Sequence, residues 1–117
     1  MQVKNEGAYE GTYHLWMKKV SSAETPVSTS GYTSIHLKYA GLTNGFDSGE
    51  YIIAEWYDGS DWHIADQIVS NGVWTYRDIT LPSGANNNPN LKIRIGTNSD
   101  KNTEWARQDA IEVTGTP

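Results

Sequence analysis

The sequence predicts an all-β domain, a two-sheet antiparallel β-sandwich. Apolar and polar residues alternate with a period of two through most of the 117 residues, which is the pattern of half-buried strands. Turn-forming residues interrupt this alternation at short intervals, and no helix of any length is expected. Long-range antiparallel pairing in a chain of this size gives two packed sheets more readily than a closed barrel. We expect seven or eight strands.

In the first two predicted strands, inward apolar residues alternate with outward residues that are mostly polar. Strand 12–20 places Leu and Met on one face and Trp16 on the other, between His and Lys. The polar residues at 21–30 predict a loop. Strand 32–39 turns its Ile, Leu and Tyr inward and His36 outward.

A predicted hairpin occupies the middle of the chain. The loop 41–49 contains Asn-Gly and Ser-Gly pairs, which favour turns. Strand 50–57 follows, and Asp-Gly-Ser-Asp then turns the chain into its partner, 62–69. The outward residues of the first of these strands are unusually apolar for a solvated face: Tyr51, Ile53, Glu55 and Tyr57.

Three more strands complete the prediction. Strand 73–81 follows an Asn-Gly turn and is stopped by a proline. Strand 91–97 points Ile and Leu inward and Arg94 outward, and strand 106–114 carries Gln108 on an outward position. Of the tryptophans, Trp16 is predicted to be outward and Trp105 to lie at a rim. Three others are expected in the core or at its edge: Trp56, Trp62 and Trp74.

Composition excludes several classes of function. The net charge is −5 and the basic residues are scattered, so a nucleic-acid groove is not expected. The chain has no cysteine, which excludes a disulfide framework, a thiolate zinc site and a cysteine nucleophile. No stretch has the length of a membrane-spanning helix. The opening Met-Gln-Val-Lys lacks a signal peptide and is typical of the added start of an excised domain, so one domain is expected over 1–117.

Four stretches together carry a resemblance to a known group of modules. They are Ser-Gly-Tyr-Thr-Ser-Ile at 30–35, Glu-Trp-Tyr-Asp-Gly-Ser-Asp-Trp at 55–62, the strand at 74–82, and Asp-Ala-Ile-Glu-Val-Thr-Gly at 109–115. In this order the chain resembles the jelly-roll β-sandwich modules of galactose-binding-like, carbohydrate-binding type that are appended to secreted microbial hydrolases. The resemblance covers most of 11–115. It implies a jelly-roll topology, an extracellular location, a monomer, and a neighbouring catalytic domain in the parent protein.

The same resemblance implies a structural calcium ion. Such modules place an aspartate two residues before an Ile or Val on the last strand, which matches Asp109, and take a second ligand from the N-terminal strand, which points to Glu10, with Glu6 as the other choice. Calcium takes six to eight oxygen ligands, so carbonyls and water would have to complete the site. If calcium is absent, Asp109 is expected to accept backbone N–H bonds.

A catalytic site is not predicted. Glycosidases need two facing carboxylates, and most acidic residues here sit in turns, leaving Glu55 as the best single candidate. The three histidines are separated in sequence, and no Gly-x-Ser-x-Gly elbow is present.

Sugars bind by stacking on aromatic rings beside oriented polar groups. The leading prediction is therefore a non-catalytic carbohydrate-binding module for soluble or amorphous polysaccharide. Its platform is predicted to be Trp16 with Tyr51 or Tyr57, provided that their strands share a sheet, and its polar partners are His36, Glu55, Arg94 and Gln108. A calcium-stabilised accessory domain of a secreted protease or surface protein is the alternative, and a hydrolase or lyase using Glu55 is a weaker third.

Overall fold

The computed structural model is an all-β sandwich, and it describes residues 3–5, 15–18, 20–69, 72–98 and 105–117. Its described strands are β1 (Val3–Asn5), β2 (Leu15–Lys18), β3 (Val20–Pro26), β4 (Thr33–Asn44), β5 (Tyr51–Tyr57), β6 (Trp62–Val69), β7 (Thr75–Thr80), β8 (Lys92–Asn98) and β9 (Trp105–Thr116). A single 3-10 turn, η1 (Ser83–Ala85), is present in this part of the chain. No helix in the described residues is long and apolar enough to cross a membrane.

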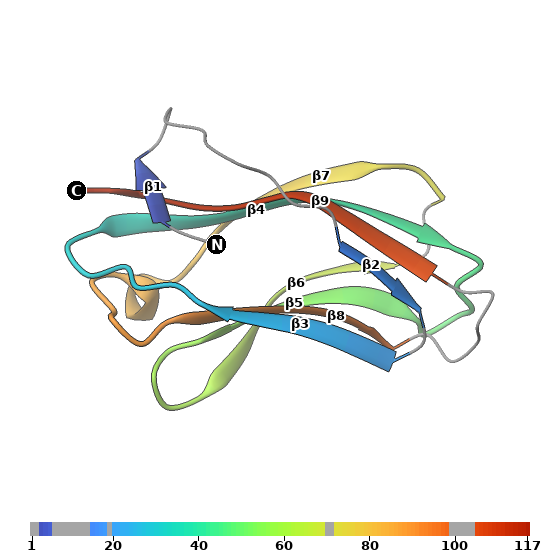
Figure 1. Ribbon diagram of the computed structural model, residues 1–117, viewed down its shortest axis with the longest axis horizontal. Helices are drawn as coiled ribbons and strands as arrows, with labels where there is room; N and C mark the ends of the chain where they lie inside the picture. The colour runs from blue at the N-terminus through green and yellow to red at the C-terminus, as the bar shows by residue number, and fades with distance from the viewer. Residues whose placement is uncertain (1–2, 6–14, 19, 70–71, 99–104) are drawn as a thin grey trace.

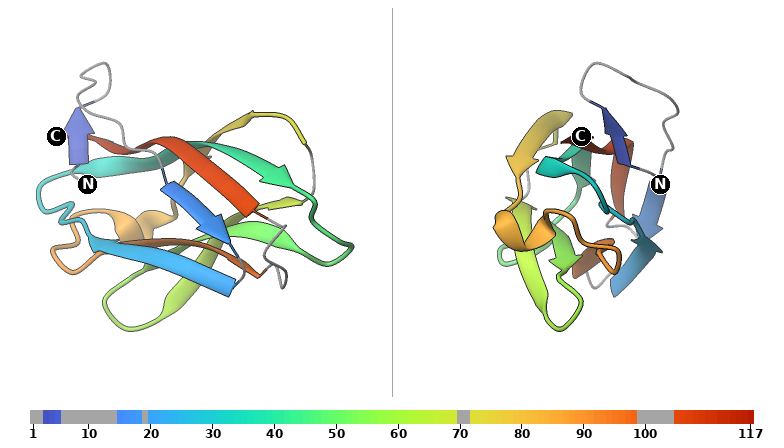
Figure 2. Two further views of the ribbon diagram at one scale, coloured as in Figure 1. Left: turned by 45° about the vertical axis from the view of Figure 1, so that its right-hand side comes forward. Right: turned by 90° about the vertical axis from the view of Figure 1, so that its left-hand side faces the viewer.

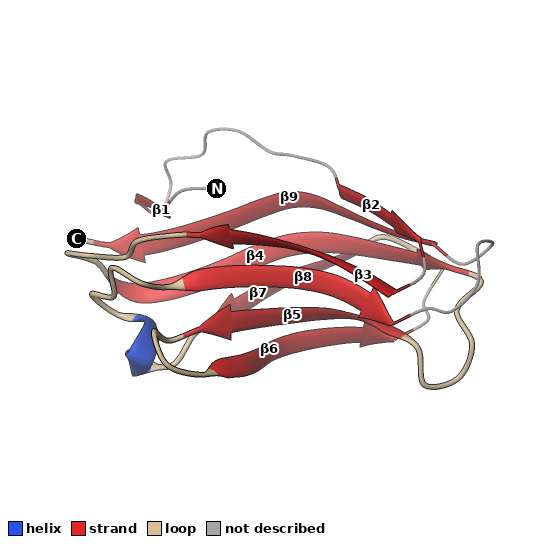
Figure 3. Cartoon of the chain, turned by 60° about the horizontal axis from the view of Figure 1, so that its bottom comes forward, coloured by secondary structure: helices blue, strands red, loops and turns tan. Residues whose placement is uncertain are grey.

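The strands form two layers (Figure 1). Sheet A has the order β1-β9-β4-β7, with β2 also paired to β9, and sheet B has the order β3-β8-β5-β6. Figure 3 shows the four strands of sheet B side by side. The short β1 runs parallel to β9, and the other pairs are antiparallel. The strand pairing therefore confirms the predicted two-sheet sandwich.

The core lies between the layers and is built from alternate residues of the central strands. Strand β4 contributes Ile35, Leu37 and Tyr39, which are fully buried. Strands β5 and β8 contribute the facing side chains from sheet B: Ile52, Ala54, Trp56, Ile93 and Ile95. The period-two pattern read from the sequence therefore identifies the inward face of these strands correctly.

Two predicted boundaries are wrong for identifiable reasons. The residues 21–26 were predicted to be part of a loop, but they belong to strand β3. This strand pairs with β8 along its whole length. This strand is at the edge of sheet B, and an edge strand tolerates exposed polar residues and a proline such as Pro26. Its composition therefore resembles that of a loop.

The predicted break after residue 39 is also absent, because β4 continues to Asn44 through Gly41. A Cβ atom at Gly41 would lie 2.8 Å from Ile68 Cδ1 and 3.1 Å from Ile52 Cδ1. The glycine makes room for side chains of the opposite sheet, so it belongs to a strand interior and does not mark a turn.

A polar contact crosses the core between the two layers. The Tyr39 hydroxyl of β4 donates a hydrogen bond to Asp66 Oδ2 of β6 at 2.8 Å, and Arg77 Nε lies 3.5 Å from the same oxygen. Burial, followed by the bond to Asp66, raises the pKa of Tyr39 far above its ordinary value. The hydroxyl therefore stays protonated and keeps its role as donor.

The turn between β5 and β6 is closed by Asp58. Its Oδ1 accepts the backbone N–H groups of Ser60 and Asp61 at 2.7 and 2.8 Å, and its Oδ2 contacts His63 Nε2 at 2.8 Å. The bond to His63, then the bonds to Asp61 and Ser60, lower the pKa of Asp58 from 3.8 to about 2. The turn therefore depends on an ionised carboxylate.

This turn gives a prediction for acid solution. Because the folded-state pKa is depressed, its contribution to stability is complete above the unfolded value of 3.8 and is lost as pH falls through about 2. We expect an NMR titration of the Asp58 side-chain carboxyl to have its midpoint near 2, and His63→Ala to move it toward 3.8. A midpoint near 3.8 in the unsubstituted protein would contradict the contacts described.

Candidate functional site

The outer face of sheet B carries the largest set of predicted site residues. Tyr51, Glu55 and Tyr57 of β5 are half-buried and alternate with buried neighbours, as predicted. Arg94 of β8 points to the same side, and Lys92 follows it along the strand. We call this surface the sheet B face, defined by Tyr51, Ile53, Glu55, Tyr57, Trp62, Lys92 and Arg94.

An ion pair lies at the centre of the sheet B face. Arg94 Nε donates a hydrogen bond to Glu55 Oε1 at 2.9 Å, and the two residues are direct partners in the β5–β8 register. This hydrogen bond raises the pKa of Arg94 above its ordinary value. On the other side of Arg94, the register places Glu24 of β3 directly opposite. In the strand register Arg94 therefore stands between Glu24 and Glu55, and it bonds to Glu55.

Aromatic rings adjoin this row. The ring centroids of Tyr57 and Trp62 are 5.3 Å apart with their planes tilted by 43°. The Arg94 guanidinium lies over the Trp62 ring, 3.9 Å from its centroid, and the Lys92 ammonium is 5.1 Å from the centroid of Tyr57. Both cations of β8 therefore lie against aromatic rings of this face, an arrangement in which the ring and the charge attract each other.

A shallow hollow lies beside the ion pair. It has a volume of about 360 Å³, and Ser22, Gly96 and Ile53 line it from three neighbouring strands. Because Gly96 has no side chain, the surface is lower at this point of β8. Glu55 and Arg94 line the hollow, and so does Tyr51, whose N–H donates to Asn98 Oδ1 at 2.8 Å. Polar and aromatic groups therefore surround a space of ligand size.

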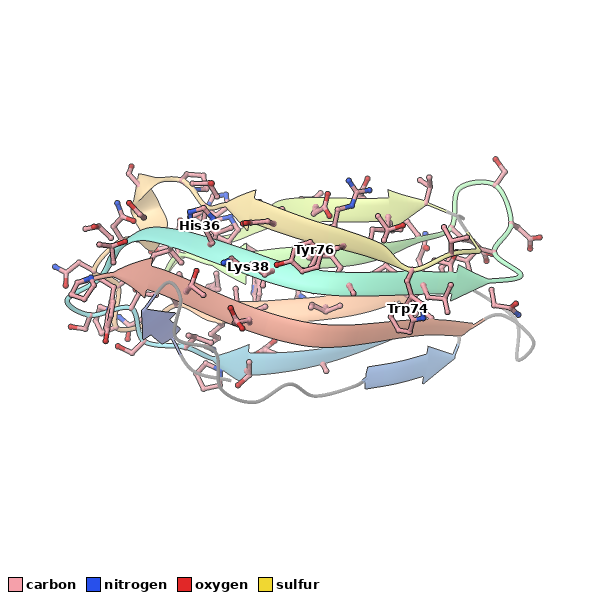
Figure 4. The ribbon with its side chains drawn as sticks, turned by 90° about the horizontal axis from the view of Figure 1, so that it is seen from above. His36, Lys38, Trp74 and Tyr76 are labelled. Atoms are coloured by element: carbon pink, nitrogen blue, oxygen red, sulfur yellow. The ribbon has the colours of Figure 1, made fainter. Side chains whose placement is uncertain are left out.

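The outer face of sheet A carries a second group of exposed side chains, drawn in Figure 4. Trp74 and Tyr76 are 48% and 62% exposed. His36 and Lys38 of β4 lie on the same face, and His36 Nδ1 is 2.8 Å from Asp78 Oδ1. We call this surface the sheet A face, defined by His36, Lys38, Trp74, Tyr76 and Asp78.

The structure therefore separates residues that were predicted to form one platform. Tyr51, Glu55, Tyr57 and Arg94 lie together on the sheet B face. His36 lies on the sheet A face, on the opposite side of the sandwich. Trp16 is on β2 and Gln108 on β9, both in sheet A, so the condition that Trp16 shares a sheet with Tyr51 and Tyr57 is not met. The side chains of Trp16 and Gln108 lie outside the described residues.

Two tryptophans were predicted on the wrong side. Trp62 was expected in the core opposite Trp56, but the hairpin register pairs it with Tyr57, so it belongs to the sheet B face. Trp74 was expected in the core or at its edge and is half exposed. The length of the turn at 58–61 was the signal that could have placed Trp62, because a one-residue change of register moves a side chain to the other face. Trp56 is buried, as predicted.

The predicted calcium site depends on acidic side chains that lie together. No group of three or more His, Cys, Asp or Glu side chains among the described residues lies close enough to hold an ion. Strand β9 places the backbone of Asp109 opposite Ala40 in sheet A. The Asp109 side chain, together with Glu10 and Glu6, lies outside the described part of the chain, so the predicted calcium ligands stay a prediction.

Comparison of the chain with protein-family models, with curated proteins and with solved structures gave no match.

Proposed function

We propose that this chain is a non-catalytic carbohydrate-binding module that binds its glycan on the sheet B face. The observation that carries the proposal is the hollow beside Glu55 and Arg94, which has aromatic rings along the same strand. The C–H faces of a sugar pack against aromatic rings, and its hydroxyls need both donors and acceptors. The sheet B face supplies aromatic rings, hydrogen-bond donors on Arg94 and hydrogen-bond acceptors on Glu55.

The ion pair supports the proposal because it orients both kinds of polar group. The bond between Arg94 Nε and Glu55 Oε1 uses one of the five N–H donors of the guanidinium and one of the two carboxylate oxygens. The remaining donors and the second oxygen can bond to sugar hydroxyls. Since the pair is already formed, less side-chain entropy is lost when a ligand binds.

The arrangement of charge favours binding without hydrolysis. Hydrolysis of a glycosidic bond requires one carboxyl group that holds a proton and a second that is ionised. Glu24 and Glu55 stand on either side of Arg94 in the strand register. Of these two carboxylates only Glu55 lines the hollow, and it already accepts a hydrogen bond from Arg94, so the hollow suits the recognition of hydroxyls better than a reaction that needs two facing carboxyl groups.

The aromatic geometry supports soluble or amorphous chains as the ligand. The Tyr57 and Trp62 planes are tilted by 43°, and Arg94 lies against the Trp62 ring, so the described aromatics do not form a flat row suited to a crystalline surface. The strand orders β2-β9-β4-β7 and β3-β8-β5-β6 support the jelly-roll topology that the resemblance implies. The same resemblance implies that the protein is secreted and that its partner is the catalytic domain of a parent hydrolase, and we propose both.

A second candidate function is a structural accessory domain. The sheet A face favours it, because the Trp74 and Tyr76 rings are exposed there, and exposed apolar side chains of this kind can pack on another domain. In that case calcium, held by Glu10 and Asp109, would stabilise the fold. The two functions use opposite faces of the sandwich.

Affinity electrophoresis tests the proposal. The protein is run through gels containing xylan, mannan, β-glucan, pectin, alginate or a chitin derivative, with calcium and with a chelator. We expect retardation by at least one polymer. The absence of retardation in every gel would sink the glycan-binding proposal and favour the accessory domain. Retardation that the chelator abolishes would show that calcium supports the binding fold.

A further inference from the structure

The floor of the hollow on the sheet B face is a single glycine. Gly96 of β8 is paired with Ser22 of β3 on one side and with Ile53 of β5 on the other. Its outward neighbours along β8 are Arg94 and Asn98, because alternate residues of a strand point to the same face. All four neighbours line the hollow of about 360 Å³. The charge on these walls therefore decides which class of sugar fits.

The hollow has one cation on its wall, and this cation already has an anionic partner. Among the lining residues, Arg94 carries the positive charge and Glu55 carries the negative charge. Arg94 Nε donates to Glu55 Oε1 at 2.9 Å, and the two side chains are 29% and 19% exposed. Salt screens a partly buried pair of this kind much less than a fully exposed one. The walls of the hollow therefore have no net charge.

The surface around the hollow is balanced in the same way. Lys92 is the other cation of β8 on this face, and it lies over the Tyr57 ring, 5.1 Å from the ring centroid. Glu24 of β3 is exposed and lies opposite Arg94 in the strand register. Lys92 and Arg94 are thus balanced by Glu24 and Glu55, in a chain whose net charge is −5. These described side chains offer a polyanion no surplus of positive charge.

Neutral and acidic sugars make different demands on this wall. A sugar hydroxyl can accept from the remaining N–H groups of Arg94 and donate to the second oxygen of Glu55 while the ion pair stays intact. The carboxylate of a uronate can only accept. To reach Arg94 it must lie beside the Glu55 carboxylate or displace it. The first arrangement brings two like charges together, and the second leaves Glu55 without its cation.

We propose that the hollow takes the uncharged sugars of a neutral glycan and excludes uronates, and that Glu55 is the residue that sets this preference. The inference rests on the proposed glycan binding and deepens it by naming the class of sugar. Glu55 acts in two ways. It accepts hydrogen bonds from the hydroxyls of the ligand, and it holds the Arg94 guanidinium so that this charge is not available to an anion.

Pairs of polymers with the same backbone and different charge test this preference by affinity electrophoresis. The pairs are xylan and carboxymethyl xylan, hydroxyethyl cellulose and carboxymethyl cellulose, galactomannan and polymannuronate, and methyl-esterified pectin and polygalacturonate. In any pair that retards the protein, we expect the acidic member to bind at least about tenfold more weakly than the neutral one. Equal or tighter binding of the acidic member would overturn the preference while glycan binding itself would hold. The absence of retardation in every pair would overturn the proposed function and this inference with it.

Three variants with the same net charge separate the effect of the hollow from that of the whole chain. Glu55→Gln, Ser22→Lys and Glu112→Gln each change the net charge from −5 to −4. Glu55→Gln removes the negative charge from the hollow, and Ser22→Lys adds a cation at its exposed rim. In both variants we expect binding of the acidic polymer, relative to its neutral partner, to rise about threefold or more.

Glu112→Gln is the control, because Glu112 belongs to β9 of sheet A, which Figure 2 shows in the layer opposite β3. We expect this variant to keep the binding ratio of the unsubstituted protein. An equal change in all three variants would show that net charge sets the preference, and would overturn the proposal. Unchanged ratios in the folded Glu55→Gln and Ser22→Lys variants would also overturn it. Ser22 is exposed on an edge strand, so Ser22→Lys carries the test if Glu55→Gln is unfolded.

Discussion

Replacing Trp56 with alanine is expected to lower the free energy of unfolding by about 3–5 kcal/mol, because it removes the largest side chain that sheet B places in the core. Trp56 is 4% exposed and its ring contacts His63 at 4.7 Å between centroids. Domains of this size are usually stable by only about 5–15 kcal/mol, so the variant is expected to be near its folding limit at 37 °C. Urea unfolding followed by circular dichroism at 25 °C measures the change.

Trp74→Ala is the matched control for this prediction. The residue type is the same, but Trp74 is 48% exposed on the sheet A face. Surface substitutions of this kind usually change stability by no more than about 0.5 kcal/mol. If Trp56→Ala costs no more than Trp74→Ala, then the core described between the two sheets is wrong.

Replacing Trp62 with alanine is expected to weaken binding to any polymer that retards the protein by about tenfold or more, which is about 1.4 kcal/mol. The substitution removes one ring of the sheet B face and also the surface on which the Arg94 guanidinium lies, 3.9 Å from the ring centroid. Both the apolar contact and the orientation of the ion pair are then weakened. Retardation measured over a series of polymer concentrations gives the affinity.

The control for this prediction is again Trp74→Ala, which removes an exposed ring from the opposite face. We expect it to bind as the unsubstituted protein does. Circular dichroism must show that Trp62→Ala keeps the fold. A folded Trp62→Ala variant with unchanged retardation would contradict the assignment of the sheet B face, and a loss in Trp74→Ala would move the site to the sheet A face.

The parts of the fold that could be predicted were those with a strong period-two pattern. In β5 the alternation of buried Ile52, Ala54 and Trp56 with half-buried neighbours is confirmed. The pattern was weaker at β7, where Arg77 occupies an inward position beside Asp66. This inward charge concealed the direction of the strand, so Trp74 was predicted on the wrong side.

The outward direction of the site residues could be predicted from the sequence, but their positions relative to one another could not. Glu55 and Arg94 were both read as outward from their own strands, and this required only local pattern. Whether they meet depends on β5 pairing with β8, and β6, β7 and η1 lie between these two strands in the sequence. The same long-range pairing places His36 in the other sheet. Local alternation fixes the face of a residue, whereas the choice of sheet depends on contacts that are distant in sequence.

The most direct test of the account maps the glycan onto the protein by NMR. A soluble oligosaccharide of the retained polymer is added to the labelled protein, and the five tryptophan indole N–H signals and the backbone amides are followed. We predict shifts at Trp62 and at the amides around Tyr51, Glu55 and Arg94, with the Trp74 signal unchanged. Shifts at Trp74 and Tyr76, with the sheet B face unaffected, would contradict the account.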